Sequence, residues 1–182
     1  MSSSDRRRAA LEDLAAAGGQ NMPVEIVEYD PAWPAAFAAE QQRLSPLLDG
    51  APIHHMGSTA VVDLAAKPII DMIVLVESYE PAISRLITEA GYQYPAAYNA
   101  TLSTKRWLCF PSAAIRTHHI SLVTDPAELS RHLRFRDALR TDAALAREYE
   151  ALKRSLAERY RHDRDAYTQA KREFVQRHER AR

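Results

Sequence analysis

The chain contains 182 residues, of which 46% are hydrophobic and 26% are charged, so its length and composition fit a single globular domain. Acidic and basic side chains are equal in number, 24 of each, which excludes a general electrostatic attraction to nucleic acid or to an anionic membrane. The single cysteine, Cys109, excludes an internal disulfide, and no run approaches the ~20 apolar residues that span a bilayer. Any site for a polyanion must therefore be local.

The first 22 residues differ in composition from the rest, and we interpret them as an appendage with a short helical stretch at 9–17 that ends at Gly18-Gly19. They contain no long apolar segment of the kind found in secretory signals, so we expect a cytoplasmic protein. Residues 23–182 are expected to form one domain.

Strands and helices are expected to alternate through the first half of the chain. Short runs of apolar residues predict strands at 24–27, 53–56 and 68–76. Asp30-Pro31 is a cap followed by proline, which predicts a helix that continues to about residue 48. Ser58 is a candidate N-cap for a short helix to Ala66. Another helix is predicted at 78–91, with Gly91 as its end.

The second half of the chain changes from strands to helices. Residues 106–110 and 117–123 have the aromatic and β-branched content of paired strands, which we expect to be antiparallel neighbours. Asp125-Pro126 forms another cap, after which helices are predicted at 127–140, 142–160 and 164–180. The predicted fold class is α+β, with a mixed β-sheet flanked by helices and followed by a C-terminal helical segment from about residue 126.

Asp71 is the one charged residue in the apolar run 68–76, where a strand buried on both faces is expected. Burying an unpaired carboxylate costs several kcal/mol, so Asp71 predicts a metal ion, a basic side chain or a reacting group beside it. The Gly57-Ser58 turn lies upstream of this strand, with Ser58 thirteen residues before Asp71. Such a turn can receive phosphate while the carboxylate receives magnesium. The structural alternatives are an ordinary capped turn and a buried ion pair.

The stretch from His54 to Asp71 resembles the signature of the GrpB family, whose fold belongs to the nucleotidyltransferase superfamily related to DNA polymerase beta. Further blocks between residues 24 and 174 are similar to the family, namely 29–34 with Phe37, 116–119, 132–137, 139–140, 149–153 and 167–174. The resemblance implies a nucleotidyltransferase-like mixed sheet.

In that superfamily, as the resemblance implies, a Gly-Ser turn binds the β- and γ-phosphates of a nucleotide, and strand carboxylates at alternate positions bind magnesium. Here Ile73 occupies the second position after Asp71, and the neighbouring strand 117–123 contains no acid. Only half of the carboxylate pair is present, which argues against a two-metal mechanism. Relatives often carry Pro-Gly where Val62-Asp63 stands, so Asp63 is either a local substitute for the missing acid or a helix surface residue.

Cationic and aromatic side chains are candidates to bind the remaining phosphate charge. Tyr149 and Lys153 are four residues apart, as are Tyr167 and Lys171, so each pair shares a helix face. Lys67 and Arg136 are further candidates for phosphate binding. The structural alternatives are a solvated helix face, a surface ion-pair cluster around the arginine, and a lysine that balances a helix C-terminus.

Two histidine doublets suggest a metal site, but successive residues of a strand face opposite sides, so each doublet supplies one ligand per face. We therefore expect His55, His118 and His119 to support the site as polar residues rather than to bind zinc.

Two functions are consistent with these residues. The first is an enzyme that uses Mg²⁺ and ATP or another nucleoside triphosphate to modify a small-molecule acceptor, by direct nucleotidyl transfer or through an acyl-adenylate that yields an amide or ester. Asp71 would be both the metal ligand and the catalytic residue. The alternative is an accessory module that binds a nucleotide or anion with little transfer activity. In some bacterial chains of the family the domain is joined to a dephospho-CoA kinase, which would suit a role near coenzyme A metabolism. We expect neither nucleic acid nor a membrane as a partner.

Overall fold

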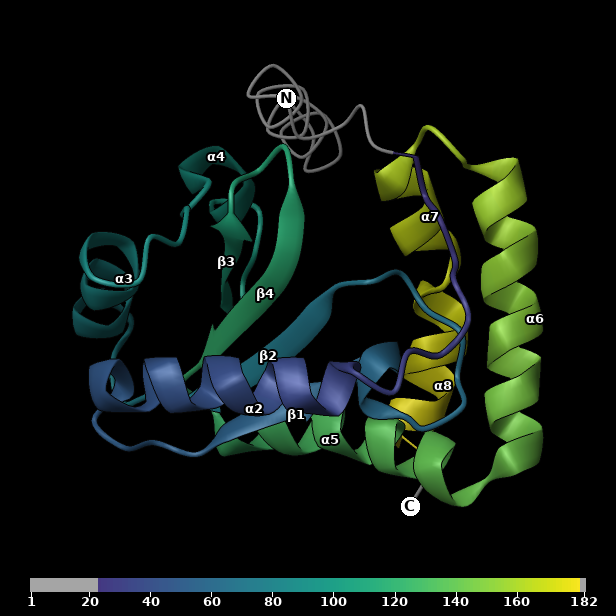
Figure 1. The fold of residues 1–182 in the computed structure, drawn as a ribbon, viewed down its shortest axis with the longest axis horizontal. Helices are drawn as coiled ribbons and strands as arrows, with labels where there is room; N and C mark the ends of the chain where they lie inside the picture. Colours follow the sequence, from purple (N-terminus) through teal and green to yellow (C-terminus); the bar gives the residue numbers. More distant parts are fainter. Residues whose placement is uncertain (1–22, 181–182) are drawn as a thin grey trace.

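The computed structural model describes residues 23–180, in which helices surround a four-stranded sheet (Figure 1). The strands are β1 (Ile53–Met56), β2 (Ile70–Leu75), β3 (Arg106–Pro111) and β4 (Arg116–Val123). The helices are α2 (Trp33–Leu44), α3 (Tyr79–Thr88), α4 (Ala96–Asn99), α5 (Pro126–Thr141), α6 (Ala143–Arg159), α7 (Arg164–Ala170) and α8 (Arg172–Arg180). The expected appendage of residues 1–22 lies outside the described residues.

The sheet is mixed, with the strand order β1-β2-β4-β3. The inner strands β2 and β4 are parallel, and each outer strand is antiparallel to its neighbour. The predicted antiparallel pairing of residues 106–110 with 117–123 is confirmed, as is the mixed α+β class. In the central pair Asp71 lies beside His119 in register, which places both side chains on one face of the sheet.

The opposite face of the sheet carries the main hydrophobic core. Helices α2 and α3 cover this face and pack against alternate side chains of the strands. The buried set includes Trp33, Leu44, Met72, Val74, Ile83, Leu86, Ile120 and Leu122. Burial of each large side chain in this layer contributes about 1.5–3 kcal/mol. The layer therefore fixes the strands that present Asp71 and His119 on the other side.

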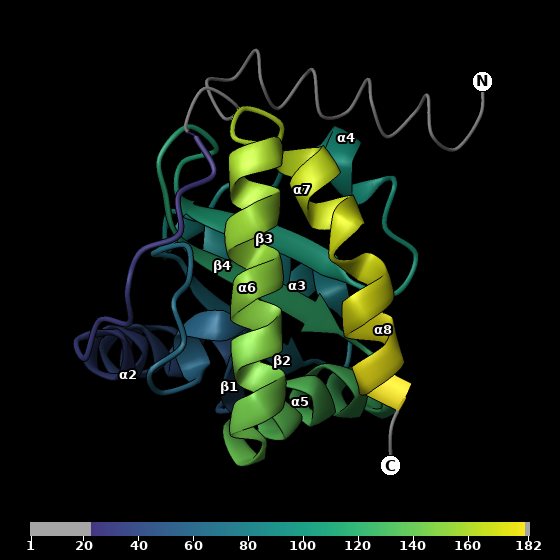
Figure 2. The same cartoon turned by 90° about the vertical axis from the view of Figure 1, so that its right-hand side faces the viewer.

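Helices α5 to α8 cover the face that carries Asp71, as the second view shows (Figure 2). Three of these helices begin at aspartates whose side chains accept hydrogen bonds from backbone amides, namely Asp125 for α5, Asp142 for α6 and Asp163 for α7. A second apolar cluster joins α5 and α6 to the loop after Ser58, through Val61, Leu64, Phe135, Leu139, Leu145 and Tyr149. The predicted cap at Asp125 is confirmed.

Three predicted elements differ from the structure. Residues 24–27 form no strand; Val27 makes an isolated bridge to Ala66. Ser58 does not cap a helix, because only the 3-10 turn η2 (Ser58–Ala60) forms there and Val61 is already extended. The predicted helix 164–180 is divided at Lys171, since α7 packs against α6 whereas α8 packs against α5.

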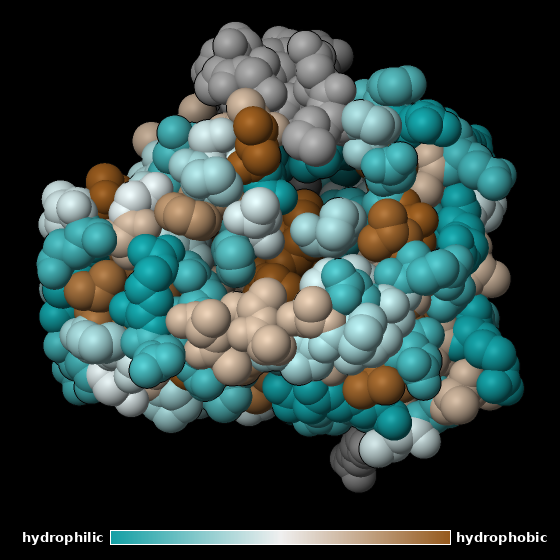
Figure 3. Space-filling view, viewed as in Figure 1, coloured by the Kyte–Doolittle hydropathy of each residue, from teal (hydrophilic) through white to brown (hydrophobic). Residues whose placement is uncertain are grey.

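The exposed large hydrophobic residues of the described chain are scattered, namely Val27, Val62, Ile87 and Ile115. On the face drawn in Figure 3, hydrophobic residues form separate small patches among hydrophilic ones. Among residues 23–180, every helix is too short or too polar to cross a lipid bilayer.

Candidate functional site

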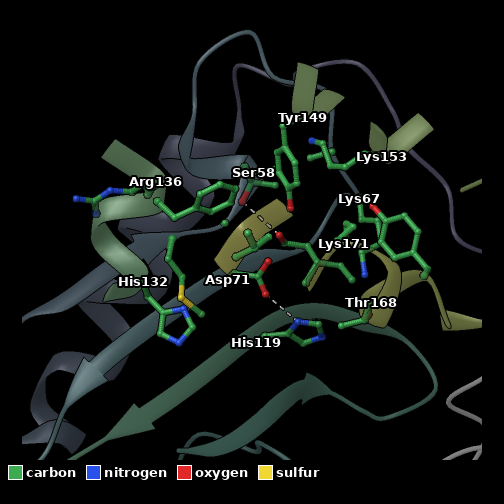
Figure 4. A pocket seen from close by; sticks show the side chains of 18 of the residues that line it. Ser58, Lys67, Asp71, His119, His132, Arg136, Tyr149, Lys153, Thr168 and Lys171 are labelled. Carbon is green, nitrogen blue, oxygen red and sulfur yellow. Dashed lines mark hydrogen bonds and ion pairs between the residues drawn. The ribbon is translucent and has the colours of Figure 1, made fainter. Parts of the chain in front are cut away.

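A cavity of about 350 Å³ lies between the Asp71 face of the sheet and the C-terminal helices (Figure 4). Ten of the residues that the sequence singled out line it, namely Gly57, Ser58, Lys67, Asp71, His119, Arg136, Tyr149, Lys153, Tyr167 and Lys171. They come from two strands, the turn and loop between β1 and β2, and the C-terminal helices with the residue that joins α7 to α8. The fold thus brings distant segments to one space.

Gly57 fits closely against the Asp71 carboxylate. The residue has φ 71° and ψ −170°, a conformation that is essentially restricted to glycine. A β-carbon at this position would lie 2.8 Å from Asp71 Oδ2, a distance that real β-carbons do not show. Glycine is therefore required both by the backbone and by the carboxylate, and Ser58 lies next to it at the edge of the cavity.

Asp71 is paired with His119, not with an internal arginine or lysine. His119 Nδ1 lies 2.9 Å from Asp71 Oδ1. Burial alone would raise the pKa of Asp71, but the hydrogen bond and charge of His119, together with Lys67 and Lys171, lower it. The other ring nitrogen of His119, Nε2, is buried and has no hydrogen-bond partner among the described residues. The carboxylate is thus ionised and oriented at the cavity wall.

Three lysines approach the cavity from different elements. Lys67 precedes β2, Lys153 lies on α6, and Lys171 joins α7 to α8. Lys67 and Lys171 lie 5.3 and 4.1 Å from the centre of the Tyr167 ring, and Lys153 lies 5.0 Å from that of Tyr149. Burial lowers the pKa of Lys67 to about 8 and that of Lys153 to about 7, and it also lowers the pKa of Lys171. Keeping these lysines charged in the cavity costs free energy, and a bound anion would offset that cost.

The predicted phosphate ligand Arg136 is engaged with the protein itself. Its Nη1 donates to the carbonyl oxygen of His55 at 3.0 Å, and its Nε pairs with Asp137 at 2.7 Å. Arg140 on the same helix donates to the carbonyl oxygen of Ala60 at 2.9 Å. These contacts hold the start and the end of the Gly57-Ser58 segment against α5. Arg136 lines the cavity, but its guanidinium is directed away from Asp71 (Figure 4).

Two of the predicted supporting histidines lie outside the cavity. His55 stacks on Phe37 and shares a hydrogen bond of 3.0 Å with Thr59, and burial lowers its pKa to about 4. His118 precedes His119 on β4, so its side chain points to the opposite face, where it lies near Phe110. Only the second member of that doublet faces the cavity, as the alternation of strand side chains predicts.

Asp63 does not replace the missing strand acid. It is exposed, it does not line the cavity, and it has φ 61°. Left-handed backbone of this kind favours glycine and tolerates aspartate or asparagine, so Asp63 has a structural explanation as a turn residue.

Other charged residues of the cavity were not singled out by the sequence. Lys105, His132 and Glu179 also line the cavity, and Glu179 is 2% exposed and paired with Arg131. No local pattern in the sequence indicates these residues, because each is an ordinary charged side chain until the helices pack over the sheet.

The described residues could provide only a partial metal site. Within residues 23–180, no group of three or more histidine, cysteine, aspartate or glutamate side chains is placed to hold a metal ion. Ile73, at the position of the second carboxylate, is 0% exposed. Asp71 Oδ2 is still available, and Mg²⁺ commonly binds one or two carboxylates and completes its shell with water and substrate phosphates. The donor set therefore fits a Mg²⁺ ion that arrives with a phosphorylated ligand.

If the Gly57-Ser58 turn binds phosphate, as the sequence predicts, replacing Ser58 with alanine is expected to weaken nucleotide binding about tenfold while changing the melting temperature by no more than a few degrees. The hydroxyl makes no capping hydrogen bond, so its removal does not unravel η2. Isothermal titration calorimetry and thermal unfolding of the same variant measure the two effects. A large fall in melting temperature with unchanged affinity would show that the hydroxyl has a structural role instead.

Fold and cavity together define a class of protein: a mixed α+β domain with a cationic pocket built around one oriented carboxylate. The model of the family described as GrpB protein matches residues 23–181, and this chain belongs to the GrpB family.

Relatives are found in several bacteria. A UPF0157 protein of Pseudomonas aeruginosa is 41% identical over 85% of this chain, and the UPF0157 protein YqkA of Bacillus subtilis is 36% identical over 84%. The chain spans only 65% and 45% of the length of these two relatives. The glutamate-rich protein GrpB of Alkalihalophilus pseudofirmus is 31% identical, with 84% of this chain and 91% of that protein aligned.

The crystal structure of the conserved protein GrpB from Enterococcus faecalis has the same fold. It superposes with a TM-score of 0.74 at 37% sequence identity, and the match covers 85% of this chain and 94% of that one.

Proposed function

We propose that this chain is a nucleotidyltransferase-like enzyme that binds Mg²⁺ and ATP or another nucleoside triphosphate and acts on a small-molecule acceptor. The observation that carries the proposal is a single cavity faced by the Gly57-Ser58 turn, the Asp71 carboxylate and a wall of lysines. Its volume of about 350 Å³ lies within the range for small-molecule sites.

The charges of the cavity support an anionic ligand. Seven cationic side chains line it, namely Lys67, Lys105, Lys153, Lys171, Arg116, Arg136 and Arg164. Only three carboxylates of the described chain do so, those of Asp71, Asp165 and Glu179. The chain as a whole has no net charge, so this local excess of cations favours a polyanion such as a triphosphate at this place.

In the proposed site Asp71 would hold Mg²⁺ together with phosphate oxygens, and the ion would offset phosphate charge. His119 orients the carboxylate through its Nδ1 and fixes which oxygen faces the ligand. Ser58 and the Gly57 backbone amide would bind phosphate oxygens at the turn. Lys67, Lys153 and Lys171 would bind the remaining phosphate charge.

The proposed reaction transfers the nucleotidyl group, which is the α-phosphate together with its nucleoside. A bond forms between the α-phosphorus and an acceptor oxygen while the bond from the α-phosphorus to the bridging oxygen of the β-phosphate breaks, and pyrophosphate leaves. If the acceptor is a carboxylate, the product is an acyl-adenylate, whose AMP is then displaced by an amine or a hydroxyl to give an amide or an ester. The lysines would stabilise the charge that develops on the pyrophosphate.

A catalytically weak accessory module that binds a nucleotide or anion is the second candidate, and one observation favours it. Among the described residues Asp71 is the only acid at the Gly57-Ser58 turn, because Ile73 is buried at the position of the second carboxylate and the neighbouring strand β4 contains no acid. Such a module would keep the phosphate pocket without rapid transfer, and the link to coenzyme A metabolism belongs to this alternative.

The purified protein, incubated with Mg²⁺, α-labelled ATP, CTP, GTP or UTP and a metabolite pool, separates the two candidates. The enzyme predicts saturable nucleotide binding and labelled adducts that require Mg²⁺. Saturable binding without adducts under every condition supports the module. Absence of binding to all four triphosphates would contradict both.

A further inference from the structure

Lysine is used in this chain only at the cavity. The sequence contains four lysines, and all four line this one space, whereas the other basic residues are arginines. Arginine keeps its charge wherever it lies, but a lysine ammonium changes its protonation when it is crowded or buried. The cavity therefore contains every side-chain amine of this chain, whereas arginines are also found elsewhere.

Three of the four amines form a cluster, which we define as Lys67, Lys153 and Lys171. Figure 4 shows them on one side of Asp71, with Arg136 and His132 on the other. Lys153 is 2% exposed, and its Nζ donates to the carbonyl oxygen of Ala65. Within residues 23–180, none of the three amines forms an ion pair with a carboxylate, although their positive charges repel one another. Asp71 offsets part of the charge of Lys67 and Lys171, and Glu150 part of that of Lys153, so the cluster is a cationic site with more positive charge than the acids beside it offset.

The acids near the cluster, Asp71 and Glu150, form hydrogen bonds with other groups. Asp71 is held by His119, and Glu150 accepts hydrogen bonds from the Ala65 amide at 3.1 Å and from Arg154 at 3.0 Å. Asp71 attracts Lys67 and Glu150 attracts Lys153, but other cations oppose them, with Arg164 and Arg116 acting on Lys67, and Arg154 on Lys153. Lys105 differs, because three acids act on it, namely Glu128, Asp71 and Glu179.

From this arrangement we infer that the lysine cluster is a binding site for a chain of condensed phosphates, which inorganic tripolyphosphate occupies without a nucleoside, and that its occupation draws protons onto the lysines. The inference rests on the proposed function in so far as it concerns the same cavity. It names the phosphate chain as the part of the ligand that is recognised. A single phosphate carries too little charge to offset three ammonium groups and the arginines beside them.

Binding of a polyanion and protonation of the lysines are expected to favour one another. Burial lowers the pKa of Lys67 to about 8 and that of Lys153 to about 7, so both lose protons as the pH of the free protein rises through 7 to 9. A bound polyanion favours the charged form and raises these pKa values. Binding therefore takes up protons in this window, and affinity falls as the pH rises.

Lysine labelled with ¹³C at the ε-carbon tests the inference, because the chain has only four such groups. NMR titration of the free protein should show Lys67 and Lys153 deprotonating near pH 8 and pH 7, and Lys171 deprotonating below the usual range of a lysine. Addition of sodium tripolyphosphate, without Mg²⁺ or nucleotide, should raise their midpoints by about one pH unit or more, with a smaller change at Lys105. Calorimetry at pH 8 in two buffers of different ionisation enthalpy should record uptake of about one proton or more.

Two matched variants test whether the lysine cluster causes the tripolyphosphate binding and the proton uptake. Lys171→Met should weaken tripolyphosphate binding about tenfold and reduce the proton uptake, whereas Arg147→Met, which removes an exposed charge from α6, should leave both unchanged. Unchanged lysine titrations in the presence of tripolyphosphate would overturn the inference even if nucleotidyl transfer were observed. Lysine titrations that respond to tripolyphosphate, in a protein that binds no nucleoside triphosphate, would overturn the proposed function and keep the inference.

Discussion

Replacement of Asp71 by asparagine is expected to lower nucleotidyl transfer at least about a hundredfold, a loss of about 2.7 kcal/mol in transition-state stabilisation. Among the described residues Asp71 is the only acid beside the Gly57-Ser58 turn, and the amide of asparagine binds Mg²⁺ much more weakly than a carboxylate does. The size is unchanged, so the fold should be kept. Formation of the labelled product, measured as kcat/KM for the triphosphate, gives the result.

Asp63→Asn is the matched control. Asp63 is exposed and lies outside the cavity, and asparagine tolerates its backbone conformation of φ 61°. The control removes the same charge and should transfer at the rate of the parent. If Asp71→Asn kept the parental rate, the carboxylate would have no part in the reaction, and the proposed function would lose its central residue.

The Gly57→Ala variant is expected to lose at least about tenfold in nucleotide affinity and several degrees in melting temperature. Its new methyl group would lie 2.8 Å from Asp71 Oδ2 and 3.2 Å from Asp71 Cβ, so the carboxylate must move. The backbone conformation adds strain of about 1–3 kcal/mol, and each kcal/mol lowers the melting temperature of a chain of this size by about 2–4 °C. Calorimetric titration and thermal unfolding measure the two losses.

The Gly50→Ala variant separates the effect of backbone strain from that of the contact with the Asp71 carboxylate. Gly50 also has a positive φ, 72°, but a β-carbon there would meet nothing within 4 Å. This variant should lose stability without losing nucleotide affinity. Equal affinities for Gly57→Ala and the parent protein would show that the position of the Asp71 carboxylate does not matter for binding.

Local patterns predicted most of the secondary structure. The strand at 53–56 and the paired strands at 106–110 and 117–123 agree with β1, β3 and β4, because alternation and β-branched residues act over a few neighbouring positions. Asp125 begins a helix as predicted. Ser58 misled the prediction, because serine is common both at helix N-caps and in turns. The conformation after Ser58 depends on how residues 61–69 pack against distant helices, which local sequence does not encode.

The candidate site was predictable in part. Asp71 stood out because a lone acid in an apolar run is costly, and Gly57-Ser58 because of its position before that strand. The partner of Asp71 was not predictable, since His119 reaches it only through the parallel register of β2 with β4, 48 residues away in the chain. The same holds for Lys105 and Glu179, which are ordinary charged residues until the helices fold over the sheet.

The sequence by itself therefore determined the fold class, the family and the presence of a carboxylate that requires a partner. These depend on hydrophobic periodicity, on composition and on the free-energy cost of burying a charge in an apolar strand. The tertiary structure alone decided that His119 is the partner, that His55 and His118 face elsewhere, and that every lysine of the chain meets in one cavity. The physical reason is that pairing and repulsion act through space, and strand register and helix packing set which distant charges come close.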